Sequence, residues 1–294
     1  MGRVITTAIA VVPASIGQEP QPQFRGGIEL VTVDVSVRER GRPVLGLTRD
    51  DFEVLDNGVR QEVADIAYGS LPIDVTLGLD VGFANAALRG ERLRDAVGQF
   101  MTFLDADDRL KLLMFNGGSD RSVDFTTDRA VIDRALRDVG RRGRLGITDT
   151  LSAALASPSP TDRRQLIIFL TDGALGSTAT PASLTELAQR ARATLTMIMP
   201  IPVPQASARF EPTAAQRERT EGLTALVRET GGGITWMTDN ADLARPLRRA
   251  LDEFRSTYVV LFTPRGVDPG GFHALQVSVK RTGLMVKARR GYLR

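Results

Sequence analysis

The sequence predicts an α/β protein in which a doubly wound, mostly parallel sheet is inserted into a small antiparallel β module. Between Pro72 and about Arg255, short apolar runs alternate with segments of helical periodicity, a pattern typical of a parallel sheet covered on both faces. In residues 28–66 and 257–290 the pattern changes to alternating apolar and polar side chains, which indicates half-buried strands. Neither flanking segment can bury a core alone, so we expect the two to pair.

The first β segment begins with a strand in which four valines alternate with polar residues from Val31 to Arg38. A second strand, from Phe52, meets Asn57-Gly58. Asn-Gly supplies the positive φ angles that a tight two-residue turn requires, so we expect a hairpin there.

The middle segment predicts five buried strands separated by amphipathic helices. The strands are expected at Ile73–Asp80, Leu110–Phe115, Gln165–Thr171, Leu195–Met199 and Ile234–Met237. The helices are expected at Leu93–Leu104, at Val131–Val139, after Thr180-Pro181, before Gly231, and at Asp242–Phe254. Pro246 should lie in the first turn of the last helix, or kink it.

The second β segment predicts three strands. Tyr258–Phe262 is stopped by Thr263-Pro264, His273–Val279 alternates apolar with polar side chains, and a turn at Arg281-Thr282-Gly283 leads into Leu284–Ala288.

Composition excludes several classes of function. The 294 residues contain no cysteine, so disulfides, thiolate metal sites and a cysteine nucleophile are absent. The net charge of +3 is a small difference between 38 basic and 35 acidic residues. We interpret the runs Arg141–Arg144 and Arg289-Arg290 as solvated faces, because no aromatic residues interleave with them, and expect no nucleic-acid partner.

The N-terminus resembles a secretory signal. Arg3 precedes the apolar run Val4–Val12, and small residues suited to cleavage follow up to Gly17. We therefore expect a signal peptide at residues 1–17, a linker at 18–27, and an extracellular or periplasmic protein. No other run reaches the ~18 apolar residues of a membrane span, so none is expected.

Four motifs in order resemble a von Willebrand factor A (VWA) domain: LGLD at 77–80, DRLKLLMF at 108–115, GITDTL at 146–151 and IIFLTDG at 167–173. The flanks, GRPVLGLTRDDFEVLDNGVRQEV before the domain and FRSTYVVLFTP after it, resemble the VWFA-related proteins abundant in Acidobacteria. The resemblance implies a VWA domain at 71–256 between β-module parts at 28–70 and 257–294.

The resemblance also implies a metal-ion-dependent adhesion site at the carboxyl ends of the strands. Residue by residue, Asp80 matches the first aspartate of that site, Thr148 the threonine, and Asp172 the aspartate of the third loop. Gly82 and Ala84 stand where the family has two serine ligands, and neither side chain offers an oxygen. We expect a weak or lost Mg²⁺ site and no other cofactor; a water-rich site stays open as an alternative.

Catalysis is the less favoured class. The single histidine, His273, lies in a late strand of the other module and is expected to be packed or at a sheet edge rather than to act as a base. Asn116–Ser119 lacks the lysine and spacing of a phosphate-binding loop. Asp107-Asp108 is interpreted as a solvated turn.

We expect a non-catalytic protein-binding, adhesion or scaffold module of the cell envelope or secreted space, with a protein partner. The alternative is a divergent hydrolase that uses the acidic cleft formed by Asp80 and Asp172 at the top of the sheet.

Overall fold

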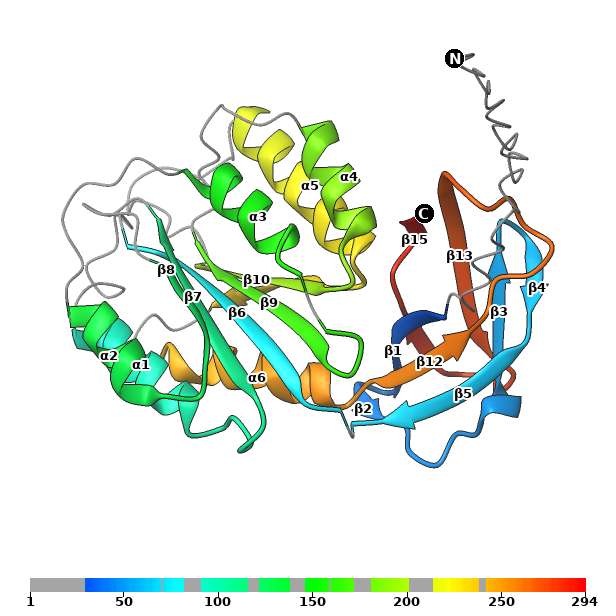
Figure 1. The fold of residues 1–294 in the computed structure, drawn as a ribbon, viewed down its shortest axis with the longest axis horizontal. Coiled ribbons are helices and arrows are strands. Elements are labelled where there is room, and N and C mark those ends of the chain that lie inside the picture. The colour runs from blue at the N-terminus through cyan, green and yellow to red at the C-terminus, as the bar shows by residue number, and fades with distance from the viewer. Residues whose placement is uncertain are drawn as a thin grey trace, which may run out of the picture.

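The computed structural model describes residues 30–69, 71–81, 91–115, 122–137, 146–158, 160–171, 181–200, 214–237 and 242–294 (Figure 1). The expected signal peptide and linker lie outside these residues. Among the helices within them, none is both long enough and apolar enough to cross a membrane.

A six-stranded sheet with the order β11-β10-β9-β6-β7-β8 forms the centre of the α/β part. Its strands are β6 (Ile73–Asp80), β7 (Arg109–Phe115), β8 (Ser122–Thr126), β9 (Arg164–Leu170), β10 (Thr194–Pro200) and β11 (Gly233–Met237). All pairs are parallel except β7 with β8. The five expected strands are present to within one residue at each end. The edge strand β8 was not expected, because it is only partly buried and has no continuous apolar run.

Helices cover both faces of this sheet, as Figure 1 shows. They are α1 (Glu91–Met101), α2 (Arg129–Arg137), α3 (Ile147–Leu155), α4 (Pro181–Arg190), α5 (Ala214–Glu229) and α6 (Ala244–Arg255). One core cluster joins α1, α2 and α6 to the sheet, and a second joins α3, α4 and α5 to the opposite face. Pro181 opens α4 and Pro246 lies in the first turn of α6, as expected; α3 was not expected.

The β part consists of antiparallel strands from both ends of the chain. They are β1 (Val31–Glu39), β2 (Arg42–Pro43), β3 (Phe52–Asp56), β4 (Val59–Gln61), β5 (Val63–Tyr68), β12 (Tyr258–Phe262), β13 (Phe272–Val279), β14 (Met285–Lys287) and β15 (Gly291–Leu293), with a short 3₁₀ helix at Arg49–Asp51. One sheet has the order β14-β1-β12-β5, with β2 beside β1, and another has the order β15-β13-β3-β4. Side chains of both sheets share a third core cluster.

The pairing of early and late strands agrees with the expectation for the two β segments. β1 pairs with β12 from Val31 opposite Phe262 to Val35 opposite Tyr258, and β3 pairs with β13. The hairpin at Asn57-Gly58 is confirmed: the two residues join β3 to β4 with φ angles of 47° and 81°.

A buried arginine connects the α/β part to the β part. Arg164 is the first residue of β9 and is 4% exposed. Its Nε donates a hydrogen bond to Oδ1 of Asp34 on β1 at 2.9 Å, and its Nη2 donates to the carbonyl of Phe254 at 3.0 Å and to the hydroxyl of Thr257. The guanidinium also stacks on the ring of Phe254, 3.9 Å from its centroid. The amino end of β9 is thus fixed to β1 and to the end of α6.

A second arginine makes the same kind of connection, and the interpretation of Arg289-Arg290 as a solvated face is wrong for Arg289. Arg289 is 9% exposed, and its guanidinium donates to the carbonyls of Ala191 at 2.8 Å, Gln189 at 2.9 Å and Ala188 at 3.2 Å. These are carbonyls at the C-terminal end of α4, where a positive charge is stabilising. Burial lowers the pKa of Arg289 to about 10, so it stays charged at neutral pH.

The interpretation of Asp107-Asp108 as a solvated turn is wrong for Asp108. This side chain is 4% exposed and accepts hydrogen bonds from the backbone N–H of Ile73 at 2.7 Å and of Asp105 at 3.0 Å. Arg255, at the end of α6, forms an ion pair with it. Asp108 therefore anchors the amino end of β6 to the turn before β7.

We expect Arg164→Met to lower the free energy of unfolding by about 3 to 5 kcal/mol, because it leaves Asp34 without its buried partner. Urea denaturation followed by circular dichroism measures the change. Arg190→Met is the matched control: Arg190 pairs with Glu186 on the exposed surface of α4, so its loss should cost less than about 0.5 kcal/mol. Equal losses in the two variants would contradict the role given to Arg164.

Candidate functional site at the carboxyl edge of the sheet

Of the residues predicted from the resemblance, Asp80 lies at the carboxyl edge of the parallel sheet. Asp80 is the last residue of β6, and Thr171 directly follows β9, its neighbour in the sheet. The register pairs Leu79 with Leu170, so the next residue on each strand lies at the same edge. Open α/β sheets bind ligands at such edges.

Asp80 is held by the protein itself. Its side chain is 6% exposed, and Oδ2 accepts a hydrogen bond from the hydroxyl of Thr171 at 3.4 Å. The backbone N–H of Thr171 donates to the carbonyl of Ile198 on β10 at 3.2 Å. Thr171 therefore links the ends of three strands. The sequence analysis did not identify Thr171 as a site residue. The feature that could have indicated it is a hydroxyl residue directly after a strongly apolar strand.

Thr148 reaches the same edge from a helix. It is the second residue of α3, which begins after Gly146 and packs against β6 and β7. Thr148 is 2% exposed, and its carbonyl accepts a hydrogen bond from the hydroxyl of Ser152 at 2.9 Å, one turn further on. The first turn of α3 places N–H groups with a positive partial charge at this edge.

The remaining predicted residues, Asp172, Gly82 and Ala84, lie outside the described residues, so their positions relative to Asp80 stay a prediction. Within the described part of the chain, no group of three His, Cys, Asp or Glu side chains could hold a metal. Asp80 and Thr148 supply one carboxylate and one hydroxyl, which are oxygen ligands of the kind that Mg²⁺ takes together with several waters.

His273 belongs to a buried network in the β part rather than to this edge. Its Nδ1 lies 2.8 Å from Oδ1 of Asp56, and the hydroxyl of Tyr292 donates to Oδ2 of Asp56 at 2.7 Å. The imidazole stacks on the ring of Tyr292, and both His273 and Asp56 are 0% exposed. The expectation of a packed histidine agrees with this position. The network connects β3, β13 and β15.

Comparison with known proteins identified similar folds among solved structures. No family model matches the chain, and no curated protein matches it. The conserved hypothetical protein BatB from Bacteroides thetaiotaomicron is 13% identical, with a TM-score of 0.45 over 62% of this chain and 98% of that one. A von Willebrand factor type A structure from Catenulispora acidiphila is 14% identical, with a TM-score of 0.45 over 91% and 73%. Proximal thread matrix protein 1 from the mussel byssus, with a zinc-occupied MIDAS motif, is 13% identical, with a TM-score of 0.46 over 66% and 48%.

We expect little or no rise in the melting temperature of the unaltered protein at millimolar Mg²⁺. A bound ion stabilises the folded state by mass action, and the two serine ligands of the family are replaced by Gly82 and Ala84. The double substitution Gly82→Ser and Ala84→Ser should create a saturable rise in differential scanning fluorimetry. Adding Asp172→Ala to that double variant should remove the rise again. A saturable rise in the unaltered protein that Asp172→Ala abolishes would contradict the weak or lost site.

Tyr292→Phe should lower the free energy of unfolding by about 1 to 3 kcal/mol, because it removes a hydrogen bond from the buried carboxylate of Asp56. Tyr68→Phe is the control, since Tyr68 is 38% exposed at the end of β5. Thermal or urea unfolding of the two variants provides the comparison. An unchanged Tyr292→Phe protein would show that the network contributes nothing to stability.

Proposed function

We propose that the chain is a non-catalytic protein-binding or adhesion module in which the carboxyl edge of the parallel sheet faces its partner. In this proposal residues 71–256 form a VWA-like domain, inserted between β-module parts at 28–70 and 257–294. The proposed location is the cell envelope or the secreted space, on the strength of the signal-like residues 1–17.

The orientation of the sheet is the observation that carries this proposal. Arg164 fixes the amino end of β9 to β1, and Arg289 fixes the end of α4 to the β part. The amino ends of the parallel strands therefore face the β part, and the carboxyl edge points away from it (Figure 1). A rigid module attached at one end of a sheet presents the other end to a partner.

The polar groups at that edge suit binding better than catalysis. Asp80 is 6% exposed and already accepts the hydroxyl of Thr171, and Thr148 is 2% exposed. A general base must reach a substrate proton directly or through one water molecule. His273, the only histidine of the chain, is fully buried in the β part. The buried positions of Asp80, Thr171 and Thr148 support a structural role for these side chains at the edge.

Site-specific photocrosslinking tests the proposal. A photoreactive amino acid replaces Trp236 or Ser122, which are exposed on the two edge strands β11 and β8, toward the carboxyl edge. Control positions are Leu45 in the β part, which is 64% exposed, and Asp107 in the turn at the amino end of β7. We expect an envelope protein to crosslink at positions 122 and 236 only.

The captured protein is then purified and titrated against the unaltered chain, with the fluorescence of Trp236, the only tryptophan, as the readout. Saturable binding that Trp236 reports would support the proposal. Crosslinks confined to positions 45 and 107, or no saturable binding by the purified protein, would contradict it.

A further inference from the structure

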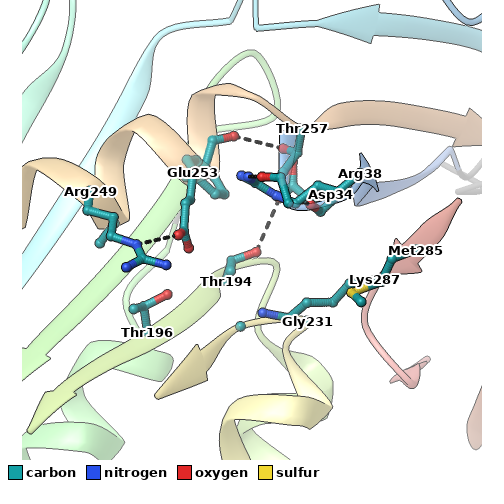
Figure 2. A pocket seen from close by; sticks show the side chains of 15 residues that line it. Asp34, Arg38, Thr194, Thr196, Gly231, Arg249, Glu253, Thr257, Met285 and Lys287 are labelled. Carbon is teal, nitrogen blue, oxygen red and sulfur yellow. Dashed lines mark hydrogen bonds and ion pairs between the residues drawn. The ribbon is translucent and has the colours of Figure 1, made fainter. Parts of the chain in front are cut away.

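A pocket of about 290 Å³ lies where the α/β part meets the β part, at the opposite end of the sheet from the carboxyl edge (Figure 2). Its walls come from both parts: β1 contributes Arg38, β10 contributes Thr194 and Thr196, α6 contributes Glu253, and β14 contributes Lys287. A wider hollow of about 570 Å³ shares Arg38, Arg249 and Glu253 with the pocket and is lined further by Arg245, Arg248 and Asp252 of α6.

Lys287 is the unusual group in this pocket. The chain has three lysines among its 38 basic residues. Lys111 forms an ion pair with Asp124 at 3.3 Å, and Lys280 is exposed directly after β13. The side chain of Lys287 extends into the pocket, and its Nζ lies so close to Gly233 that a β-carbon there would be 3.1 Å away. Within the described part of the chain, this Nζ has no hydrogen bond or ion pair.

The acidic side chains of the pocket already have arginine partners. Asp34 pairs with Arg164 at 2.8 Å and accepts the hydroxyl of Thr194 at 3.5 Å. Glu253 pairs with Arg249 at 2.8 Å, and Figure 2 shows this pair and the contact between Thr194 and Asp34. Both carboxylates therefore pair with arginines, and Lys287 forms no direct ion pair with either, although Glu253 still attracts its amine.

Arg38 is the second cation in the lining of this pocket without a carboxylate partner among the described residues. Its Nη1 donates to the carbonyl of Gly41 at 2.8 Å, and its Nε donates to the hydroxyl of Ser36 at 3.3 Å. These neutral acceptors orient the guanidinium but do not neutralise its positive charge. Arg38 and Lys287 line the same pocket, and an anion between them would neutralise both.

We propose that the pocket binds a small oxyanion, a carboxylate or a phosphate, between Lys287 and Arg38. The hydroxyl of Thr196 is the neutral donor on the facing wall, and Ala250 and Phe254 of α6 supply apolar surface. The volume is at the lower end of the range for ligand pockets, which suits a small molecule. The arginines of the outer hollow would attract an anion toward the entrance. This site is independent of the proposed partner surface, which lies at the other edge of the sheet.

The side chain of Lys287 is exposed as a whole, and the partial desolvation of its amine in the pocket supports the proposal. Desolvation lowers the pKa of Lys287; Glu253 opposes this shift and Arg38 adds to it. The charged groups that face the amine are Asp34 and Arg38 from β1 and Arg249 and Glu253 from α6. A bound anion favours the protonated amine, so binding should raise the pKa of Lys287. Affinity should fall as the pH rises through that pKa, because the amine becomes neutral.

Nuclear magnetic resonance of the full-length protein, with lysines reductively methylated with ¹³C, tests the site directly. Three lysines give three side-chain signals, of which two are internal controls. We expect sodium phosphate or sodium succinate to shift the Lys287 signal saturably and leave those of Lys111 and Lys280 unchanged. Sodium chloride at equal ionic strength should not reproduce the shift. Comparison of the phosphate titration with the succinate titration identifies which oxyanion the pocket prefers.

Matched variants of the unmethylated protein, measured by isothermal titration calorimetry, complete the experiment. Lys287→Met keeps a similar apolar stem and should raise the dissociation constant by about tenfold or more, because a charge-assisted hydrogen bond is lost. Lys280→Met should leave it unchanged, and Lys287→Arg should retain part of the affinity. Should Lys287→Met fail to fold, Arg38→Met, with the same expected loss, provides the second variant. No saturable binding, or equal affinity in Lys287→Met, would overturn the proposal, whatever the outcome of the crosslinking.

Discussion

The burial of one positive charge constrains the whole arrangement. Arg164 stands at the start of a strand in the middle of the parallel sheet, and a charge removed from water is stable only when its partners are in place. Those partners are Asp34 on β1, the carbonyl of Phe254 at the end of α6, and Thr257 before β12. The buried charge of Arg164 is therefore stable only when the parallel sheet, α6 and β1 are all in their folded positions. This requirement sets which end of the sheet faces the β part.

The two ends of the parallel sheet consequently have different chemistry. At the amino ends, Arg164, Arg289 and Asp108 are enclosed by fixed partners from distant parts of the sequence, and a cationic pocket remains between them and α6. At the carboxyl edge, Asp80 and Thr171 are held within the sheet itself. The amino end is suited to a rigid junction, whereas the carboxyl edge is where open α/β sheets bind ligands.

Periodicity predicted the strands and most helices of the α/β part because buried strands are continuous apolar runs, as Leu166–Leu170 are. It missed β8, which is only partly buried, and β15, which has three residues, and it misplaced Arg289 and Asp108. A charged residue is assigned to the surface by its type, whereas its burial depends on partners far along the chain: Arg289 binds α4, about 100 residues earlier. At the candidate site, Asp80 and Thr148 could be placed at strand and helix boundaries. The hydroxyl contact between Thr171 and Asp80 depends on strand order, which the sequence does not state.

The position of Lys287 follows from the same constraint. A guanidinium presents five donors in a rigid fork and is best buried against several fixed acceptors, as Arg164 and Arg289 are. At the pocket, the carboxylates of Asp34 and Glu253 are already paired with arginines, and the Nζ of Lys287 lies close to Gly233. A lysine brings a single charged atom with three rotatable donors to this position. In a chain whose other basic residues are nearly all arginine, the lysine lies where a fixed acceptor is missing, so the acceptor is best supplied by a ligand from solution.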